Sequence, residues 1–366
     1  MTATPATAEV APDRLALIAR TLQIPPATWL AFVTAYEASP ARPPAGESAA
    51  AESAAADTDR CVAALAGVYR EVSPHEAPLP AGASPRACAA CRLAAVRPAF
   101  ARRSPPPAPP LVYGRCARCG HGALWSDDAE ASAALYDGAG YYSVRDGRGA
   151  GYDDYGDDDA YRVGKGARLI ARLERGTPPP IHTLLEIGCG FGYTRAAAER
   201  AGWSTAGVDI SAHAVAAADR RYGQKTFHGT LAQAVASSDA AIAPGRFGVV
   251  LYQFVLEHVA DPAGELALAR ERLLPGGSLV LLVPSMETAE VEVFGASYRS
   301  FRADHLHVFS RASLAAMLGR AGFAVREIDS HCNIHLFEGL LSPRALAHLY
   351  DSGRGPDLFV RAERQP

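Results

Sequence analysis

Three glycines at alternate positions constrain the fold of this chain more than any other feature of its sequence. Gly188, Gly190 and Gly192 follow residues 182–187, an apolar run with the length and composition of a buried β-strand. Glycine is needed where the backbone turns tightly or must approach a ligand without a Cβ in the way. Such a loop is typical of an α/β sheet, where it connects a strand to the helix that follows.

From Ile181 onward the sequence alternates apolar strands with segments of helical periodicity. This alternation predicts an α/β fold, a Rossmann-like, doubly wound sheet of mostly parallel strands with helices on both faces. We expect strands at 182–187, 203–209, 224–228, 247–253, 278–284 and 324–330. We expect helices near 193–201, 211–222, 263–274 and 310–321.

Two acidic residues accompany the glycine loop. Asp209 ends the second expected strand, where a carboxylate can accept both ribose hydroxyls of an adenosine. Glu186 lies two residues before Gly188, and a carboxylate there suits the sulfonium and ammonium of S-adenosylmethionine (SAM). A dinucleotide site needs glycine or alanine at the position of Tyr193, so that the helix packs closely. The residues favour a SAM site, with a dinucleotide site or an incidental loop as the alternatives.

Several motifs, in order, resemble those of class I SAM-dependent methyltransferases over residues 181–330. They are 184–192, the Gly-Val-Asp of 207–209, the segment 247–262 with its Leu-Glu-His-Val-Ala-Asp-Pro extension, and the turn and strand of 274–284. One departure is Thr230, which stands where the family often has an acid that holds the adenine amino group, so Thr230 or a backbone amide would have to bind it here. The resemblance implies cofactor contacts from Glu186, Gly188, Cys189, Gly190, Gly192, Asp209, Ile210, Thr230 and Gln253.

Four of the seven cysteines form two Cys-x-x-Cys pairs, Cys88 with Cys91 and Cys116 with Cys119. Four thiolates can surround Zn²⁺ tetrahedrally, and Gly120 suits a turn that aims backbone amides at sulfur. We therefore expect a zinc ribbon over residues 86–126 with a structural role, because four cysteine ligands leave no open position on the metal. Redox-active thiols and unrelated buried cysteines are the alternatives.

The 366 residues suffice for one medium domain with smaller attachments. We expect a helical, low-complexity region at 1–75, the ribbon, a Tyr- and Asp-rich connector at 127–164, a methyltransferase domain at 165–340 and a C-terminal tail at 341–366. The ribbon and connector resemble an arrangement found in bacterial small-molecule and sugar methyltransferases. That resemblance implies that Tyr141 and Tyr142 line the SAM pocket. The alternative is a solvated loop.

Two histidine clusters follow strands at the edge where open α/β sheets hold ligands. Asp304 and His305 are the preferred catalytic pair, because a carboxylate beside a histidine can fix its tautomer. Sugar C-methyltransferases have an acid–histidine pair at the matching place. His258 is the second candidate, and His307 could instead be structural. Quinone O-methyltransferases have a metal-binding glutamate where this chain has Phe254, so no metal is expected beside His258.

The sequence thus predicts a SAM-dependent methyltransferase acting on a small-molecule acceptor, with O-, N- or C-transfer left open. An RNA base methyltransferase is disfavoured by the net charge of −3 and by the absence of an Asn-Pro-Pro-aromatic motif. A non-catalytic SAM-binding regulatory module is the third hypothesis. No apolar run reaches membrane-spanning length and no signal peptide is recognisable, which predicts a cytoplasmic protein without a membrane or nucleic-acid partner.

Overall fold

The computed structural model describes residues 76–104, 108–125, 159–175, 179–331 and 343–366, with scattered residues between 55 and 66. Most of the expected N-terminal helical region lies outside the described residues. The expected connector lies outside them up to position 158, and Tyr141 and Tyr142 with it.

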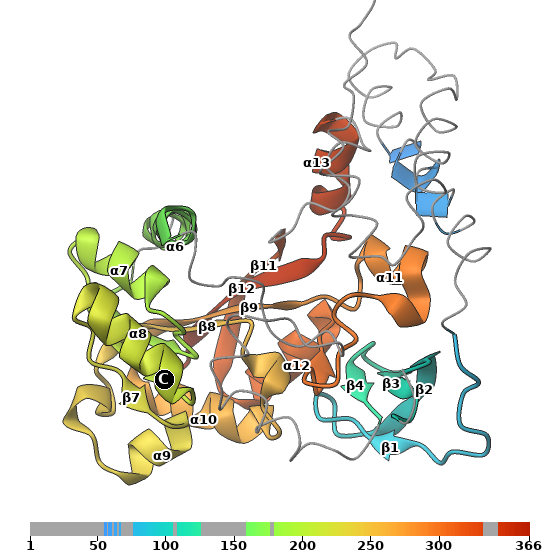
Figure 1. Ribbon diagram of the computed structural model, residues 1–366, viewed down its shortest axis with the longest axis horizontal. Coiled ribbons are helices and arrows are strands. Elements are labelled where there is room, and N and C mark those ends of the chain that lie inside the picture. Colours follow the sequence, from blue (N-terminus) through green and yellow to red (C-terminus); the bar gives the residue numbers. More distant parts are fainter. Residues whose placement is uncertain are drawn as a thin grey trace, which may run out of the picture.

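A seven-stranded sheet forms the centre of the protein (Figure 1). Its strand order is β11-β12-β9-β8-β5-β6-β7, and β12 alone runs antiparallel to its neighbours. The predicted α/β, doubly wound fold is therefore confirmed. The strands are β5 (Thr183–Ile187), β6 (Ser204–Asp209), β7 (Phe227–His228), β8 (Phe247–Gln253), β9 (Leu273–Pro284), β11 (Phe323–His331) and β12 (Asp357–Arg364).

Helices cover both faces of this sheet, as the separate apolar clusters beneath them show. One face carries α6 (Asp159–Glu174), α7 (Tyr193–Arg200) and α8 (Ala212–Tyr222). The other carries α9 (Leu231–Ala236), α10 (Pro262–Arg272) and α12 (Arg311–Arg320). The remaining helical elements are η2 (Ala240–Ile242), η3 (Leu256–His258), α11 (Ala289–Phe294), η4 (Gly295–Ser297) and α13 (Pro343–Asp351).

The C-terminal residues differ from the expected tail. They form β12, which is inserted between β9 and β11 and pairs with both along its length. Leu358, Phe359 and Val360 are fully buried there. The charged Arg361 and Arg364 interrupt the apolar pattern, and the pairing partners lie far away in the sequence, so no local signal marks the strand.

Three further elements differ in their bounds from the expected ones. α6 begins at Asp159, ahead of the expected domain start at 165. β9 begins at Leu273, which pairs with Phe247, so the preceding helix ends at Arg272 rather than 274. The strand expected at 224–228 is reduced to its last two residues.

The cysteine region forms a second sheet of order β1-β2-β3-β4-β10. Its fifth strand, β10, comes from the large domain and pairs with β4. This shared strand was not expected, because two residues give too short a pattern to recognise. The strands are β1 (Arg86–Ala87), β2 (Ala94–Arg102), β3 (Leu111–Cys116), β4 (Gly122–Leu124) and β10 (His307–Val308).

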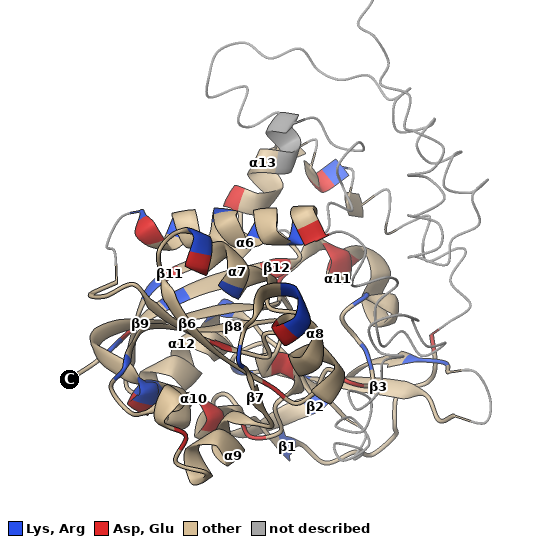
Figure 2. Cartoon of the chain, turned by 60° about the vertical axis from the view of Figure 1, so that its left-hand side comes forward, with Lys and Arg blue, Asp and Glu red and all other residues tan. Residues whose placement is uncertain are grey.

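Acidic and basic residues lie side by side on the described helices, as α6 and α8 show in Figure 2. This interspersion agrees with the small net charge of the chain. Within the described part of the chain, no helix has both the length and the apolar character needed to span a membrane.

Candidate functional site

The glycine loop connects β5 to α7 and needs its glycines for both conformation and space. Gly188, Gly190 and Gly192 have φ values of 66°, 54° and 81°, which side chains rarely allow. A Cβ on Gly188 would lie 2.3 Å from a methyl carbon of Val255. A Cβ on Gly192 would lie 2.0 Å from the side-chain oxygen of Gln224. The loop can therefore pack against Val255 and Gln224 only because Gly188 and Gly192 carry no side chain.

Asp209 is joined directly to this loop. Its Oδ2 accepts a hydrogen bond of 2.7 Å from Gly190 N, and its Oδ1 accepts one of 2.9 Å from Ser211 N. The carboxyl group is buried, and burial raises its pKa while the two amides oppose that effect. Each carboxylate oxygen has a second acceptor site. The acid therefore combines a structural tie to the loop with capacity for two ligand hydroxyls.

Glu186 lies at the end of β5 with one oxygen held and the other unpartnered. Gln253 Nε2 donates to Glu186 Oε1 and to Thr194 Oγ1, both at 2.7 Å. Glu186 Oε2 is buried and has no hydrogen-bond partner among the described residues. Burial raises the pKa of Glu186 to about 7, and the Gln253 hydrogen bond counteracts it. An unpartnered buried carboxylate oxygen is costly, so this position fits a cationic ligand group such as an ammonium.

The other expected cofactor residues lie around the same loop. Cys189 is buried in it, and burial raises the pKa of this thiol. Ile210 follows Asp209 and is 36% exposed. Thr230 begins α9, where its hydroxyl accepts from Gln233 N over 3.1 Å. Because the threonine hydroxyl caps this helix, its contact with adenine stays a prediction.

Residues 300–310, here called the histidine loop, bring the second group of candidates to η3. Asp304 is fully buried, and Arg302 donates two hydrogen bonds of 2.9 Å to its two carboxylate oxygens. Burial alone would raise the pKa of Asp304, but His305 and Arg302 lower it to about 2. The expectation that this carboxylate orients His305 is not met, because the neighbouring arginine occupies it.

Asp304 instead holds the other histidine through its backbone. His258 Nδ1 donates to the Asp304 carbonyl oxygen over 2.6 Å, which leaves the lone pair on Nε2. The ring of His258 meets that of His305 edge-on, with centroids 4.7 Å apart. Burial lowers the pKa of both imidazoles, His305 further than His258. Two histidines from distant segments thus lie together and neutral at physiological pH.

Glu257 completes this cluster. Its two carboxylate oxygens are buried and have no hydrogen-bond partner in the described structure. The Nδ1 atom of His305 is likewise buried and without a hydrogen-bond partner there. One ligand atom from each of Glu257, His258 and His305 lies within 4.8 Å of the others. One carboxylate and two imidazoles can bind a divalent cation. The sequence argument against a metal considered Phe254 alone and missed His305, which reaches the cluster from another loop.

His307 points away from this cluster. Its Nδ1 lies 3.1 Å from His121 Nε2, and its Nε2 donates to the Val259 carbonyl over 3.1 Å. Both histidines are buried, and burial lowers the pKa of His307 to about 4. These contacts give His307 a structural role in β10, where it joins His121 to the chain after η3.

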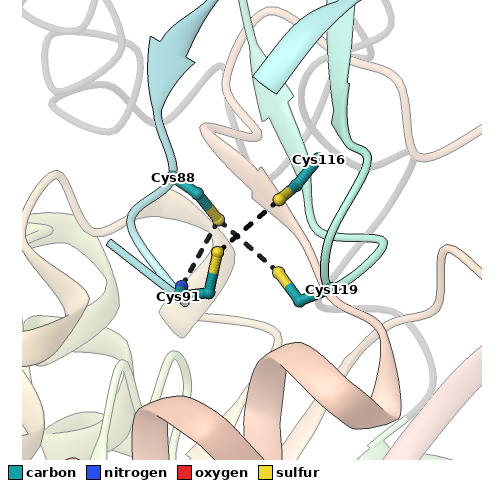
Figure 3. Close-up of side chains that lie close together, drawn as sticks. All are labelled: Cys88, Cys91, Cys116 and Cys119. Carbon is teal, nitrogen blue, oxygen red and sulfur yellow. Dashed lines mark hydrogen bonds between the residues drawn. The ribbon is translucent and has the colours of Figure 1, made fainter. Parts of the chain in front are cut away.

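The four paired cysteines converge at one point (Figure 3). Sγ of Cys88 lies 3.6 Å from Sγ of Cys119, and Sγ of Cys91 lies 3.7 Å from Sγ of Cys116. Zn–S bonds of about 2.3 Å place tetrahedral sulfurs about 3.8 Å apart. Cys91 N also donates to Cys88 Sγ over 3.5 Å, as amides do around thiolates. The donor set and its spacing fit one zinc ion.

Comparisons with known proteins agree with this geometry. Residues 159–328 match a family model described as a methyltransferase domain. A ubiquinone biosynthesis O-methyltransferase of Cereibacter sphaeroides is 37% identical over 117 residues, which are 31% of this chain and 47% of the relative. One from Thiobacillus denitrificans is 30% identical over 154 residues, 40% of this chain and 66% of the relative.

The chain spans about half the length of the first of these relatives. Among solved structures, an S-adenosylmethionine dependent methyltransferase from Mesorhizobium loti has a TM-score of 0.41 at 19% identity. That likeness covers 55% of this chain and 100% of the other.

Proposed function

We propose that the protein transfers the methyl group of SAM to a small-molecule acceptor, because residues 159–328 match a family model described as a methyltransferase domain. The main observation behind the proposal is the hydrogen bond from Gly190 N of the glycine loop to the Asp209 carboxylate. The unpartnered oxygen of Glu186 lies on the same edge of the sheet. These two features support the proposal, because SAM carries ribose hydroxyls and an ammonium group.

In this proposal Asp209 accepts hydrogen bonds from the ribose hydroxyls, and Glu186 accepts a hydrogen bond from the ammonium of the methionine moiety. Gln253 keeps the Glu186 carboxylate in place, because it donates to the other oxygen. The glycines let the backbone approach the cofactor closely. SAM, when bound, supplies the activated methyl group.

An oxygen acceptor is the one to test first, because the relatives are named O-methyltransferases. Methyl transfer is an in-line displacement, so a hydroxyl must be aligned and must lose its proton. His258 and His305 are the candidate proton acceptors, since burial keeps both neutral. A divalent cation held by Glu257, His258 and His305 would instead lower the pKa of the acceptor hydroxyl.

We further propose that Cys88, Cys91, Cys116 and Cys119 hold a structural zinc ion. All four sulfurs face one another, and burial raises the pKa of the Cys88 thiol to about 11. Without a cation the Cys88 thiol would stay protonated. Because a zinc ion binds thiolates, it would displace that proton and join β1 to the loop after β3.

The test is transfer of label from methyl-labelled SAM to a metabolite extract, with total RNA as a parallel acceptor. A labelled small molecule, identified by mass spectrometry, supports the proposal. Labelled RNA would move the assignment to a nucleic-acid methyltransferase. Tight SAM binding without transfer to any acceptor would favour a regulatory module. Asp209→Ala serves as the inactive control in each arm.

A further inference from the structure

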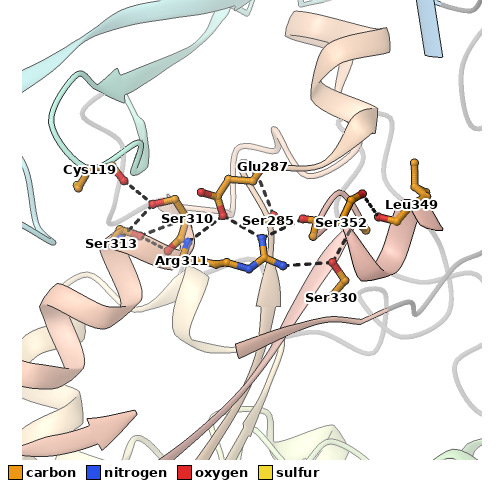
Figure 4. Close-up of polar contacts among 11 residues, drawn as sticks. Cys119, Ser285, Glu287, Ser310, Arg311, Ser313, Ser330, Leu349 and Ser352 are labelled. Atoms are coloured by element: carbon orange, nitrogen blue, oxygen red, sulfur yellow. Dashed lines mark hydrogen bonds and ion pairs between the residues drawn. The ribbon is translucent and has the colours of Figure 1, made fainter. Parts of the chain in front are cut away.

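The cysteine module, formed by β1 to β4 and the loops that carry the four paired cysteines, contacts the second half of the histidine loop at two places. Near the end of the loop, β4 pairs with β10, and Leu124 N donates to the Leu306 carbonyl over 3.0 Å. At the start of α12 the hydroxyl of Ser310 donates to the carbonyl of Cys119, which belongs to the four-cysteine cluster (Figure 4). The module is therefore in contact with the loop rather than tethered at a distance.

Tyr113 makes a further contact with the histidine loop. It lies on β3, the strand that ends at Cys116, and only 1% of its surface is exposed. Its hydroxyl donates to the backbone carbonyls of Arg302, at 2.8 Å, and of His305. Its ring stacks on Phe301 with centroids 4.4 Å apart and planes inclined by 22°. One side chain thus holds the loop on both sides of Asp304.

We propose that Tyr113 is a positioning residue for the histidine loop, so that the four-cysteine module is part of the scaffold of the active site. The inference rests on the proposed function, because it assigns this loop to methyl transfer. The carbonyls that Tyr113 holds belong to Arg302, which binds the Asp304 carboxylate, and to His305. The Asp304 carbonyl between them fixes His258.

Loss of the Tyr113 hydroxyl removes the donor to the His305 carbonyl and one of two donors to the Arg302 carbonyl, which still accepts from His305 N. The loop must then shift or admit water, and either change moves His305 and the carbonyl that orients His258. Displacement of a catalytic group by about 1 Å can lower turnover by about 10²-fold. Tyr113 itself touches no reacting atom in this scheme and acts only through the loop.

The test uses the full-length, zinc-loaded protein and the variant Tyr113→Phe, which keeps the ring stacked on Phe301 and removes the hydroxyl. Histidine labelled with ¹⁵N reports on both imidazoles by NMR, with signals assigned from His258→Ala and His305→Ala. We expect Tyr113→Phe to move the signals of both rings. With an acceptor in hand, kcat should fall by at least about tenfold while the Kd of SAM changes by less than about twofold.

Tyr252→Phe is the matched control. Tyr252 is also fully buried, but its hydroxyl donates to Glu265 Oε1 on α10 over 3.0 Å, outside the loop. Both variants lose one buried tyrosine hydroxyl and should lose similar thermal stability. The positioning role requires that only Tyr113→Phe moves the His258 and His305 signals. Equal spectra for the two variants would overturn it.

A second measurement needs no substitution. Hydrogen exchange of the unaltered protein is compared before and after zinc is removed with a chelator. The amides of His305 and Leu306, bonded to the carbonyls of Arg302 and Glu257, should lose protection, while those of α8 should keep it. Unchanged protection in the loop, or an equal loss over α8, would contradict support of the loop by the module.

Neither the NMR nor the exchange readout requires SAM or an acceptor. Failure of the proposed function would instead appear as absent SAM binding by the unaltered protein. The two hypotheses can therefore fail separately.

Discussion

The backbone carbonyl oxygen of Asp304 lies 2.6 Å from Nδ1 of His258, a residue of η3 that is 46 positions earlier in the sequence. This contact places the ring proton on Nδ1 and the lone pair on Nε2. The Asp304 carboxylate, meanwhile, is bound by Arg302 on both oxygens. The structure therefore gives His258 a defined tautomer through a backbone carbonyl, whereas the sequence favoured a role of the Asp304 carboxylate at His305.

Alanine substitutions of the two clustered histidines test their roles once the acceptor is known. His258→Ala and His305→Ala should each lower turnover, because a positioned proton acceptor contributes roughly 10²–10⁴-fold. His182→Ala is the control, since this residue stacks on Trp203 away from the cluster. Methylation rates and SAM affinity should be measured together. Normal turnover in both cluster variants would show that the acceptor needs no base from the protein.

The affinity for SAM should depend on pH through Glu186. Its pKa of about 7 means that the carboxyl group is increasingly protonated below neutrality and cannot then attract a cation. As pH rises through 7 the carboxylate forms and affinity should increase. Below 7 the affinity should fall by up to about tenfold per pH unit, because binding then releases one proton.

Calorimetry between pH 5.5 and 7.5 measures this dependence, with circular dichroism to confirm that the fold persists. Glu186→Gln should bind SAM weakly and show a flat profile. A flat profile in the unaltered protein, or the same slope in the variant, would remove Glu186 from the cofactor site.

Protein purified without added metal should contain about one zinc per chain by elemental analysis. Cys116→Ser should lose this zinc and loosen the module, while the seven-stranded sheet stays folded. Cys189→Ser is the matched control, because this buried cysteine lies in the glycine loop and outside the four-cysteine cluster. A metal-free native protein of normal stability would refute the zinc site.

A divalent cation at Glu257, His258 and His305 should stabilise the zinc-loaded protein. A ligand present at about 100 times its Kd adds about 2.7 kcal/mol to the free energy of unfolding. Mg²⁺, Mn²⁺ or Zn²⁺ should therefore raise the Tm of the unaltered protein and not that of Glu257→Gln. The control is Glu265→Gln. The Glu265 carboxylate lies outside the cluster and accepts a hydrogen bond from the Tyr252 hydroxyl. Equal shifts in all three proteins would mean that the cation binds elsewhere.

Local patterns in the sequence were enough to predict the glycine loop and its strand. The apolar run before Gly188 and the acid at Asp209 lie within one strand–helix–strand unit, so their meeting follows from the fold. The four cysteines likewise met as predicted, since two short turns bring each pair together.

Contacts between distant segments could not be predicted in this way. β12 pairs with β9 and β11, and its position between them is set by the whole sheet rather than by its own residues. The adjacency of Asp304 and His305 in the sequence suggested a hydrogen-bonded pair, but Arg302 competes for the carboxylate. Tyr113 carried no signal at all, because an isolated tyrosine in a strand is an ordinary core residue.

Titration calorimetry of SAM against the unaltered protein and Asp209→Ala tests the central claim most directly. Each charge-assisted hydrogen bond to the ribose contributes about 1.5–3 kcal/mol, so the variant should bind SAM at least about tenfold more weakly. Because Asp209 also accepts from Gly190 N, the Tm of each variant is measured alongside. Asp219→Ala, which removes an exposed carboxylate from α8, should bind SAM normally. One SAM site that weakens only in Asp209→Ala is the predicted result. Unchanged SAM affinity in that variant, or tight NAD binding by the unaltered protein, would contradict the assignment.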